Sequence, residues 1–368
     1  MNDDDGKAEV SAPAFAMVII AALLAGAGVM MSCSVYRFAP RDRGAPGHHG
    51  EKLFRNIYPT EGRGFGDVLR WKFGGGPKEE PPIPRDRIPA YRPERAAPDL
   101  ERIAHPDPGT IQVTWIGQST FLIQVDGLNL LTDPVFSDRI SPVSFIGPRR
   151  YAPPGIPFES LPKIDAVLIS HNHYDHLDRP TVRKLGDRPR YFVPLGLAAI
   201  LAGWGAHRVS ELDWGQTSFI GSVLVHAVPA QHFSNRGFGD FDKTLWAGFV
   251  LETKSGNIYF AGDTGYAPHI TDIARDFGPI RLAFLPIGAY WPRWFMSPMH
   301  MNPAEAVKAH QDLGAEDSVA MHWGTINQAD EPMAEPPIFL RTALKASGLS
   351  EDCVHIMRFG QTLVFRRR

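Results

Sequence analysis

Short apolar runs separated by turn residues recur along the chain from Ile111 onward, and this pattern predicts a protein built from many short strands. The run at Ile164–Ser170 is typical of a buried strand. The pair Asp126-Gly127, between two such runs, is typical of a hairpin turn. Strands are expected at residues 111–115, 120–125, 128–132, 164–170, 223–228, 247–253, 257–261, 282–287 and 361–366.

Helical stretches follow several of these strands, and they are expected at residues 179–185, 195–202 and 303–313. The last one has Asn302 as its N-cap and Pro303 in its first turn, a common way for a helix to begin. The order of elements predicts one mixed α/β domain over about residues 109–368. Its function is expected in the loops at the ends of the strands.

Two segments without this pattern precede the domain. Residues 37–108 are rich in proline, glycine and charge, which predicts an extended arm without a core of its own. Residues 1–36 contain the apolar stretch Ala12–Met31, which as a helix would span roughly 30 Å, the thickness of the bilayer core. We therefore expect residues 1–36 to be a membrane anchor or a signal segment.

Charges around this stretch favour a retained anchor, because acidic residues precede it, whereas signal peptides begin with basic ones. Arg37, Arg41 and Arg43 follow it, so the positive-inside rule places the body of the protein on the cytoplasmic face. A cleaved signal remains an alternative. So does a periplasmic lipoprotein attached through Cys33, because Met30-Met31-Ser32-Cys33 resembles a lipobox. Each interpretation places the protein at or across a membrane.

Composition limits the partners and the metal ligands that the chain can use. The 368 residues carry a formal net charge of −2, which gives no electrostatic reason to expect nucleic-acid binding. Only two cysteines occur, so a disulfide framework is excluded and a metal site must use histidines and carboxylates. The 14 histidines matter through their clustering.

The densest cluster directly follows the expected strand 164–170 and contains His171, His173, Asp175 and His176. Imidazole and carboxylate are ligands that suit zinc and similar metals. His171 and His173, two apart on extended backbone, project to one side. Asp175 and His176 come after a bend and can face a second position. This arrangement predicts two adjacent metal ions.

Four residues cannot fill two coordination shells, so further ligands are expected at other strand ends. His232, Asp263 and His322 each follow a short apolar run. Together they supply a third histidine to each metal and one carboxylate between them. Asp133 ends an earlier strand and is expected to orient the metal loop from the second shell of the site, although an Asp before Pro134 also suits a plain turn.

These motifs are similar to those of the metallo-β-lactamase superfamily, in which a His-x-His-x-Asp-His loop, a Gly-Asp-Thr-Gly aspartate and a final histidine recur. Further segments resemble its N-acylphosphatidylethanolamine-hydrolysing phospholipase D branch, namely 54–56, 286–296, 300–306 and 322–325. The resemblance implies an αββα sandwich with two Zn²⁺ ions between the sheets. It implies that His171, His173 and His232 hold one zinc, that Asp175, His176 and His322 hold the other, and that Asp263 bridges them.

The resemblance also implies an activity. A hydroxide shared by two zincs would attack the phosphorus of N-acylphosphatidylethanolamine-like lipids and release N-acylethanolamine and phosphatidic acid. Asp263 and His300 are the expected catalytic residues. His300 would protonate or stabilise the leaving alkoxide, or it is simply a residue where the helix begins. The expected partners are a phospholipid or other phosphodiester and the membrane, while the oligomeric state is open.

Alternatives stay open at this point. The protein could be a tethered hydrolase of a soluble lactone or another phosphodiester, or an envelope protein whose metals are structural. The same ligands would hold other divalent metals. The aromatic run Tyr290–Phe295 could line an acyl groove, contact the bilayer or belong to the core. The Gly-rich segment Phe233–Lys243 is expected to be a mobile loop beside the site.

Overall fold

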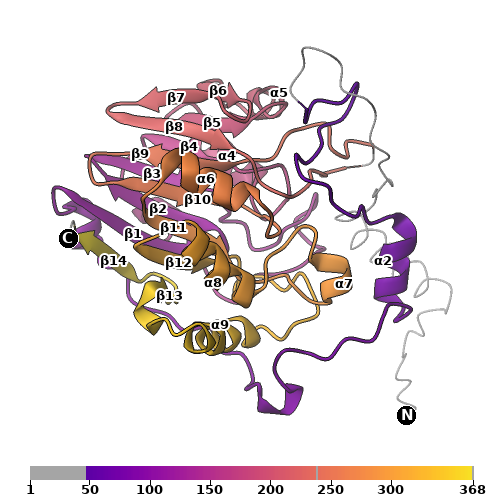
Figure 1. The fold of residues 1–368 in the computed structure, drawn as a ribbon. Coiled ribbons are helices and arrows are strands. Elements are labelled where there is room, and N and C mark those ends of the chain that lie inside the picture. The colour runs from indigo at the N-terminus through magenta and orange to yellow at the C-terminus, as the bar shows by residue number, and fades with distance from the viewer. Residues whose placement is uncertain (1–46, 238, 367–368) are drawn as a thin grey trace, which may run out of the picture.

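Two seven-stranded sheets pack face to face in the computed structural model, which describes residues 47–237 and 239–366 (Figure 1). The first sheet has the order β14-β1-β2-β3-β4-β5-β6 and the second β13-β12-β11-β10-β9-β8-β7. In the first sheet the strands are β1 (Thr110–Gly117), β2 (Thr120–Val125), β3 (Leu128–Thr132), β4 (Ala166–Leu168), β5 (Arg190–Pro194), β6 (Val209–Leu212) and β14 (Thr362–Arg366). In the second they are β7 (Thr217–Ile220), β8 (Val223–Val228), β9 (Gly248–Glu252), β10 (Asn257–Phe260), β11 (Ile280–Pro286), β12 (Asp317–Met321) and β13 (Val354–His355).

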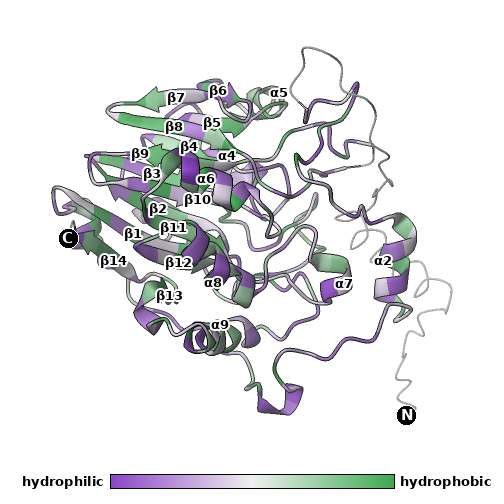
Figure 2. Cartoon of the chain, viewed as in Figure 1, coloured by the Kyte–Doolittle hydropathy of each residue, from purple (hydrophilic) through white to green (hydrophobic). Residues whose placement is uncertain are grey.

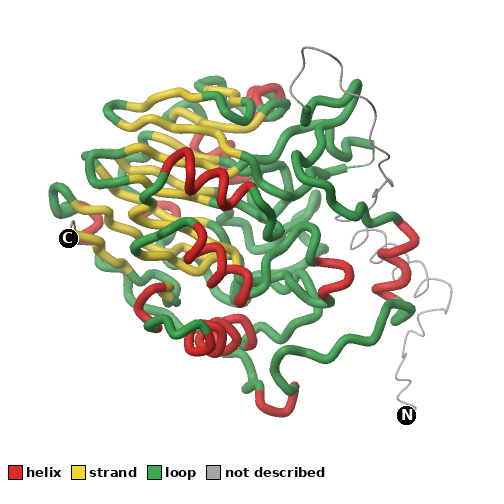
Figure 3. Tube along the Cα trace, viewed as in Figure 1, coloured by secondary structure: helices red, strands yellow, loops and turns green. Residues whose placement is uncertain are grey.

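Helices lie on the outer faces of the two sheets (Figure 3). The first sheet is covered by α4 (Arg179–Leu185) and α5 (Ala198–Ala202), and the second by α6 (His269–Phe277), α8 (Pro303–Asp312) and α9 (Glu335–Ala346). Shorter elements are α3 (Leu100–Ala104), α7 (Arg293–Met296) and the 3₁₀ turns η1 (Arg85–Arg87), η2 (Phe158–Ser160) and η3 (Glu351–Cys353). The αββα arrangement expected from the resemblance is confirmed.

Successive side chains along a strand point alternately to the core between the sheets and to the helices outside them. In β4, Ala166 and Leu168 point into the core that the two sheets share, whereas Val167 points outward and packs with Val182 of α4. Both faces of the strand are therefore buried, which explains why its sequence is apolar at successive positions. Figure 2 shows the same apolar colouring along the strands of both sheets.

The arm folds back onto the domain, so the expectation of a wholly extended segment is wrong. It contains the helix α2 (Phe65–Lys72), whose Val68 and Trp71 pack against Phe295 and Met296. Trp71 Nε1 also donates a hydrogen bond to Asp330 Oδ2 at 2.5 Å. Apolar side chains spaced along one side of α2 are buried against the domain. The proline-rich composition of the arm gave no indication of this contact.

The expected membrane segment, residues 12–31, lies outside the described residues. Within the described part of the chain, every helix is too short or too polar to cross a bilayer.

Candidate metal centre

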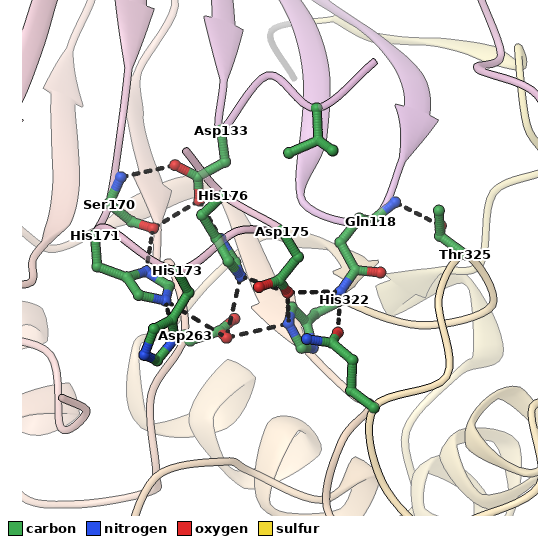
Figure 4. A network of polar contacts seen from close by, with 12 residues as sticks. Gln118, Asp133, Ser170, His171, His173, Asp175, His176, Asp263, His322 and Thr325 are labelled. Carbon is green, nitrogen blue, oxygen red and sulfur yellow. Dashed lines mark hydrogen bonds and ion pairs between the residues drawn. The ribbon is translucent and has the colours of Figure 1, made fainter. Parts of the chain in front are cut away.

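The loops that carry the predicted ligands meet at one side of the sandwich. His171, His173, Asp175 and His176 lie in the loop that follows β4. The others follow the ends of β8, β10 and β12 and are His232, Asp263 and His322. All seven side chains are buried, and the structure brings them together from segments up to about 150 positions apart. Figure 4 shows several of these side chains converging on Asp263.

Two neighbouring groups of ligand atoms result. The first group consists of the imidazoles of His171, His173 and His232, and the second of Asp175, His176, Asp263 and His322. In each group one atom per residue lies within 4.8 Å of all the others, close enough to share a metal ion. The groups contain the same residues as the two sets that the resemblance implies, with Asp263, the expected bridge, in the second.

Asp263 lies between the two groups. Its Oδ2 is 3.1 Å from His176 Nε2 and 3.1 Å from His322 Nε2 in the second group. The same oxygen is 3.8 Å from His232 Nε2 and 4.0 Å from His171 Nε2 in the first group. One carboxylate is therefore near ligands of both sets, as a residue shared by two metal ions must be.

The donor set fits metal ions rather than a self-contained hydrogen-bond network. His173 Nε2 and Asp263 Oδ1 are buried and have no hydrogen-bond partner in the described part of the chain. Leaving such atoms unpaired in a protein interior is costly. Imidazoles with carboxylates are the donors that zinc and similar divalent ions take, so the residues present fit the metals expected from the sequence.

The two groups differ in the pKa values of their imidazoles. Burial lowers the pKa of His171 and His173 well below the usual value, and that of His232 to about 4, so these imidazoles are neutral at neutral pH. Burial raises the pKa of Asp263, but His176 and His322 outweigh this effect and hold it well below the usual value. The neutral imidazoles of the first group and the ionised Asp263 are in the protonation states that metal ligation requires. In the second group burial lowers the imidazole pKa values, but Asp175 and Asp263 outweigh this effect, so the pKa of His176 lies well above its usual value and that of His322 is raised to about 9. A metal ion bound by the second group would therefore displace protons from these two imidazoles.

Asp133, at the end of β3, is hydrogen-bonded to Ser170 and to His176 of the ligand loop that follows β4 (Figure 4). Its Oδ2 accepts hydrogen bonds from Ser170 Oγ at 2.6 Å and from His176 Nδ1 at 2.7 Å, while Oδ1 accepts one from the Ser170 backbone N–H at 2.7 Å. With its Nδ1 held in this way, His176 presents Nε2 to Asp175 and Asp263. Gly262 permits this packing, because a Cβ there would lie 2.7 Å from Ser170 Cβ.

We expect Asp133→Ala to lower metal affinity or turnover about 10- to 100-fold, the usual effect of removing a partner that orients a ligand. His176 would lose the acceptor that fixes its ring, and the Ser170 N–H would lose its partner. Metal content by elemental analysis and kcat on one phosphodiester measure the effect. The control is Asp138→Ala, because that exposed carboxylate pairs with Arg149 at the surface. Unchanged metal content and turnover in Asp133→Ala would contradict the orienting role.

Sequence reasoning missed several residues that position the ligands. Gln118 Nε2 donates to Asp175 Oδ2 at 3.1 Å, and the Gln118 carbonyl accepts from the His322 backbone N–H at 3.3 Å. Asn56 binds both backbone groups of His232, because its Nδ2 donates to the carbonyl at 2.9 Å and its Oδ1 accepts from the N–H at 3.1 Å. The motif Phe54-Arg55-Asn56 was the one available signal for Asn56.

Gln118, Asp133 and His322 adopt positive φ values of 53°, 32° and 58°. Such backbone is strained for residues other than glycine, and it persists where the surrounding structure holds it. All three residues contact metal-ligand groups or carry one, so the strain coincides with the site.

His300 lies beside both ligand groups. Its Nδ1 is 3.9 Å from Asp263 Oδ2, and its ring centre is 5.1 Å from that of His232 and 5.4 Å from that of His322. Together with His232 and Asp263 it forms a third set of atoms close enough to share a metal ion. Burial lowers the pKa of His300 well below the usual value, so its imidazole is neutral here and can donate an N–H hydrogen bond.

A hollow that is partly open to solvent adjoins the ligands. Its walls come from arm residues 54–63 and from the segment after β8, and they include His232, Phe233, Phe241 and Trp246. The ring of Phe233 lies 4.6 Å from that of His173, so the hollow is next to the first ligand group. By contrast, Tyr290 and Phe295 of the aromatic run are buried in the core.

A profile of the Beta-lactamase superfamily domain matches residues 128–323, which include the seven ligand candidates. The chain belongs to the beta-lactamase superfamily. A solved structure of Igni18, a metallo hydrolase from the archaeon Ignicoccus hospitalis, shares the fold of this superfamily member, with a TM-score of 0.54 and 22% identity over 70% of this chain and 100% of that one.

Two relatives of this superfamily member carry the name that the sequence motifs suggested. N-acyl-phosphatidylethanolamine-hydrolyzing phospholipase D 1 of Caenorhabditis elegans is 41% identical over 225 residues, 58% of this chain and 63% of that protein. The mitochondrial N-acyl-phosphatidylethanolamine-hydrolyzing phospholipase D of Saccharomyces cerevisiae is 36% identical over 262 residues, 68% of this chain and 55% of that protein. The chain thus spans less than two thirds of the length of these relatives, and the resemblance to this branch is confirmed.

Proposed function

We propose that this superfamily member is a metal-dependent phosphodiesterase of the phospholipase D type, which hydrolyses N-acylphosphatidylethanolamine-like lipids to N-acylethanolamine and phosphatidic acid. The observation that carries the proposal is Asp263, whose carboxylate lies between two groups of imidazole ligands. The names of the two relatives supply the substrate class. The proposal includes two Zn²⁺ ions, because imidazole predominates among the ligands.

The bound metal ions would supply Lewis acidity, which lowers the pKa of water toward neutrality and offsets charge on phosphoryl oxygens. The protein's own part is to fix the geometry. His171, His173 and His232 would hold one ion, and Asp175, His176 and His322 the other. Asp263 would set the distance between them. No protein nucleophile is required, because water is the attacking group.

His300 would act at the leaving group. Its neutral imidazole lies next to Asp263 and can donate a hydrogen bond to the departing alkoxide oxygen. An anionic phosphodiester bound nearby raises the pKa of an imidazole, which favours proton donation during the reaction. The adjoining hollow, with Phe233, Phe241 and Trp246 in its walls, offers apolar surface to a lipid.

A lipid substrate implies contact with a membrane, and α2 offers a suitable face. Phe65, Leu69 and Phe73 recur every four positions along α2 and its C-terminal end and are exposed, with Phe73 71% accessible. The nearby Arg70 and Lys72 suit anionic headgroups. We propose that the protein is membrane-associated through residues 12–31 and that this face of α2 lies on the cytoplasmic lipid surface.

Membrane association is tested by fractionation. The full chain should stay with membranes after a high-salt wash, and removal of residues 1–36 should release most of it, because a 20-residue apolar segment anchors far more strongly than surface charges. A reporter fused to the C-terminus should report a cytoplasmic location if Arg37, Arg41 and Arg43 decide the topology. Lipid attached to Cys33 in a periplasmic protein would establish the lipoprotein alternative instead.

A hydrolysis panel tests the proposed activity. Purified protein is offered N-acylphosphatidylethanolamine, bis-p-nitrophenyl phosphate, an acyl-homoserine lactone and a β-lactam, each with and without prior chelator treatment. We expect chelator-sensitive turnover of both phosphodiesters, with N-acylphosphatidylethanolamine as the better substrate. Turnover of the lactone alone would support the soluble-substrate alternative. A folded, metal-free protein without any turnover would contradict both the phosphodiesterase proposal and the soluble-substrate alternative.

A further inference from the structure

Arg55 lies in the wall of the hollow and has no ion-pair partner among the residues that the structure describes. Its Nε is buried, and its guanidinium makes no hydrogen bond or ion pair with any described residue. Arg63 lines the same hollow but is engaged, because it binds Glu61 and the backbone carbonyls of Trp294 and Phe295. A guanidinium with a buried, unpaired donor is costly, and an anion in the hollow would remove that cost.

The backbone around Arg55 is firmly held. The Arg55 N–H donates to the His48 carbonyl at 2.9 Å, and the Phe54 N–H donates to the Asp242 carbonyl at 2.8 Å. His48 and His49 in turn contact the two carboxylate oxygens of Asp213 at 2.6 and 2.8 Å. Their imidazoles and this carboxylate fix the start of the arm on the domain.

The guanidinium itself packs against Gly50, where an added Cβ would lie 3.1 Å from Arg55 Nε and 3.2 Å from an Nη atom. Arg55 is therefore placed before any ligand arrives, which reduces the entropy lost on binding.

Arg55 is also tied to the metal ligands. The next residue, Asn56, binds the N–H and the carbonyl of His232, and Arg55 and His232 line the same hollow. A molecule in the hollow can thus approach the first ligand group and Arg55 together.

Two carboxylates, those of Glu61 and Asp242, line the hollow together with Arg55. Glu61 pairs with Arg63 at 3.1 Å, and Asp242 Oδ1 accepts from the Ser234 N–H at 3.1 Å. Neither forms an ion pair with Arg55. The remaining walls that face the interior are largely aromatic, with Phe233, Phe241 and Trp246. The hollow therefore combines aromatic walls with Arg55, which has no ion pair among the described residues, and with charged groups that have other partners, and this suits a lipid with an anionic head.

We propose that Arg55 is the anion-binding residue of this hollow and that it takes phosphoryl oxygens of a phospholipid, whether the diester of the substrate or the monoester of the product. The inference rests on the proposed function and adds a selectivity to it, namely preference for anionic phospholipids over neutral lipids with the same acyl chains. Guanidinium presents several donors in a fixed plane, which matches phosphoryl oxygens better than an ammonium group does.

The test compares binding of short-chain dihexanoyl phosphatidic acid with binding of dihexanoylglycerol, which lacks the phosphate. Titration calorimetry is done on the full chain as purified, for the wild type, Arg55→Gln, Arg55→Lys and Lys52→Gln. Lys52 is exposed in the same segment, outside the hollow, so its variant removes the same charge elsewhere. Thermal unfolding shows whether each variant is folded.

We expect Arg55→Gln to weaken phosphatidic acid binding about 10- to 100-fold, the usual loss for a charge-assisted hydrogen bond in a partly buried site. Arg55→Lys should lose several-fold less, and Lys52→Gln should bind as the wild type does. Dihexanoylglycerol binding should be the same in all four proteins. If Arg55→Gln does not fold, Arg55→Lys decides, and its wild-type affinity for phosphatidic acid would overturn the proposal.

Two results would overturn it directly. Binding of phosphatidic acid by folded Arg55→Gln within twofold of the wild type would show that Arg55 takes no anion. Equal loss for both lipids would show that Arg55 only shapes the hollow. Failure of the proposed function gives a different pattern, in which the wild type binds phosphatidic acid through Arg55 but releases no N-acylethanolamine.

Discussion

Asp263→Ala is expected to lose at least about 10³-fold in kcat and a large part of the bound metal, more than His171→Ala loses. Its Oδ2 is 3.1 Å from two imidazoles of the second group and within 4.0 Å of two in the first, whereas His171 belongs to one group. Removal of a carboxylate shared by two ions affects both ions and the charge of the site. Metal content by elemental analysis and kcat on one phosphodiester, measured for both variants, compare the two losses.

Asp276→Ala is the matched control, because this exposed carboxylate on α6 pairs only with Arg275 among described residues and belongs to neither ligand group. It should keep metal content and kcat. Wild-type metal occupancy with near-normal turnover in Asp263→Ala would refute the bridging role. Equal losses in Asp263→Ala and His171→Ala would show that the two residues serve the site to the same degree.

His300→Ala is expected to keep both metal ions and to lose about 10²- to 10⁴-fold in rate, the usual contribution of general acid catalysis. The loss should be much smaller for a p-nitrophenyl diester than for the lipid, because the p-nitrophenolate leaving group needs little protonation. Rates for the two substrates and metal content measure this. His207→Ala, at an exposed position where the imidazole contacts Asp187, controls for the loss of a histidine elsewhere.

Other outcomes for His300→Ala assign other roles. Equal losses for both substrates would mark His300 as a residue that positions the substrate or the neighbouring imidazoles. Loss of metal would make it a ligand, an arrangement that its proximity to His232 and Asp263 allows. The ligand set would then have to include His300.

The bounds of β2, β3 and β8 and of α4 follow from the sequence pattern without change. The hairpin turn Asp126-Gly127 fixes the C-terminal end of β2 and the N-terminal end of β3, and Asp126 adopts the positive φ that such turns require. The ligand candidates could be found for a related reason. A histidine or aspartate directly after an apolar run lies at a strand end, and strand ends meet in space.

The pattern missed the interior strands β5 (Arg190–Pro194) and β12 (Asp317–Met321), and several other elements that are short or partly polar. β6 (Val209–Leu212), β7 (Thr217–Ile220) and β13 (Val354–His355) lie at the sheet edges, where half-exposed side chains leave no clear alternation. α6 and α9 bury only a narrow apolar stripe, such as Ile270 and Ile273 in α6. Pairing with neighbours in the folded protein, rather than local sequence, decides these elements.

The supporting role of Asp133 could be predicted from its place at a strand end, but the roles of Asn56 and Gln118 could not be found from local sequence. Asn56 is 176 positions from His232, and Gln118 is 57 positions from Asp175. Neither lies in a cluster of ligand-type residues. Their roles come from the packing of the arm and of the β1–β2 turn against the strand ends, which depends on the whole fold.

The most direct measurement of the central claim uses N-acylphosphatidylethanolamine in water enriched in ¹⁸O. Products of the purified protein are identified by mass spectrometry, with the Asp263→Ala variant as the inactive control. The account predicts N-acylethanolamine without the label and phosphatidic acid with one ¹⁸O atom on phosphorus, because water attacks the phosphorus and the P–O bond to the ethanolamine breaks. Release of free fatty acid or diacylglycerol in place of these products, or labelled N-acylethanolamine, would contradict it.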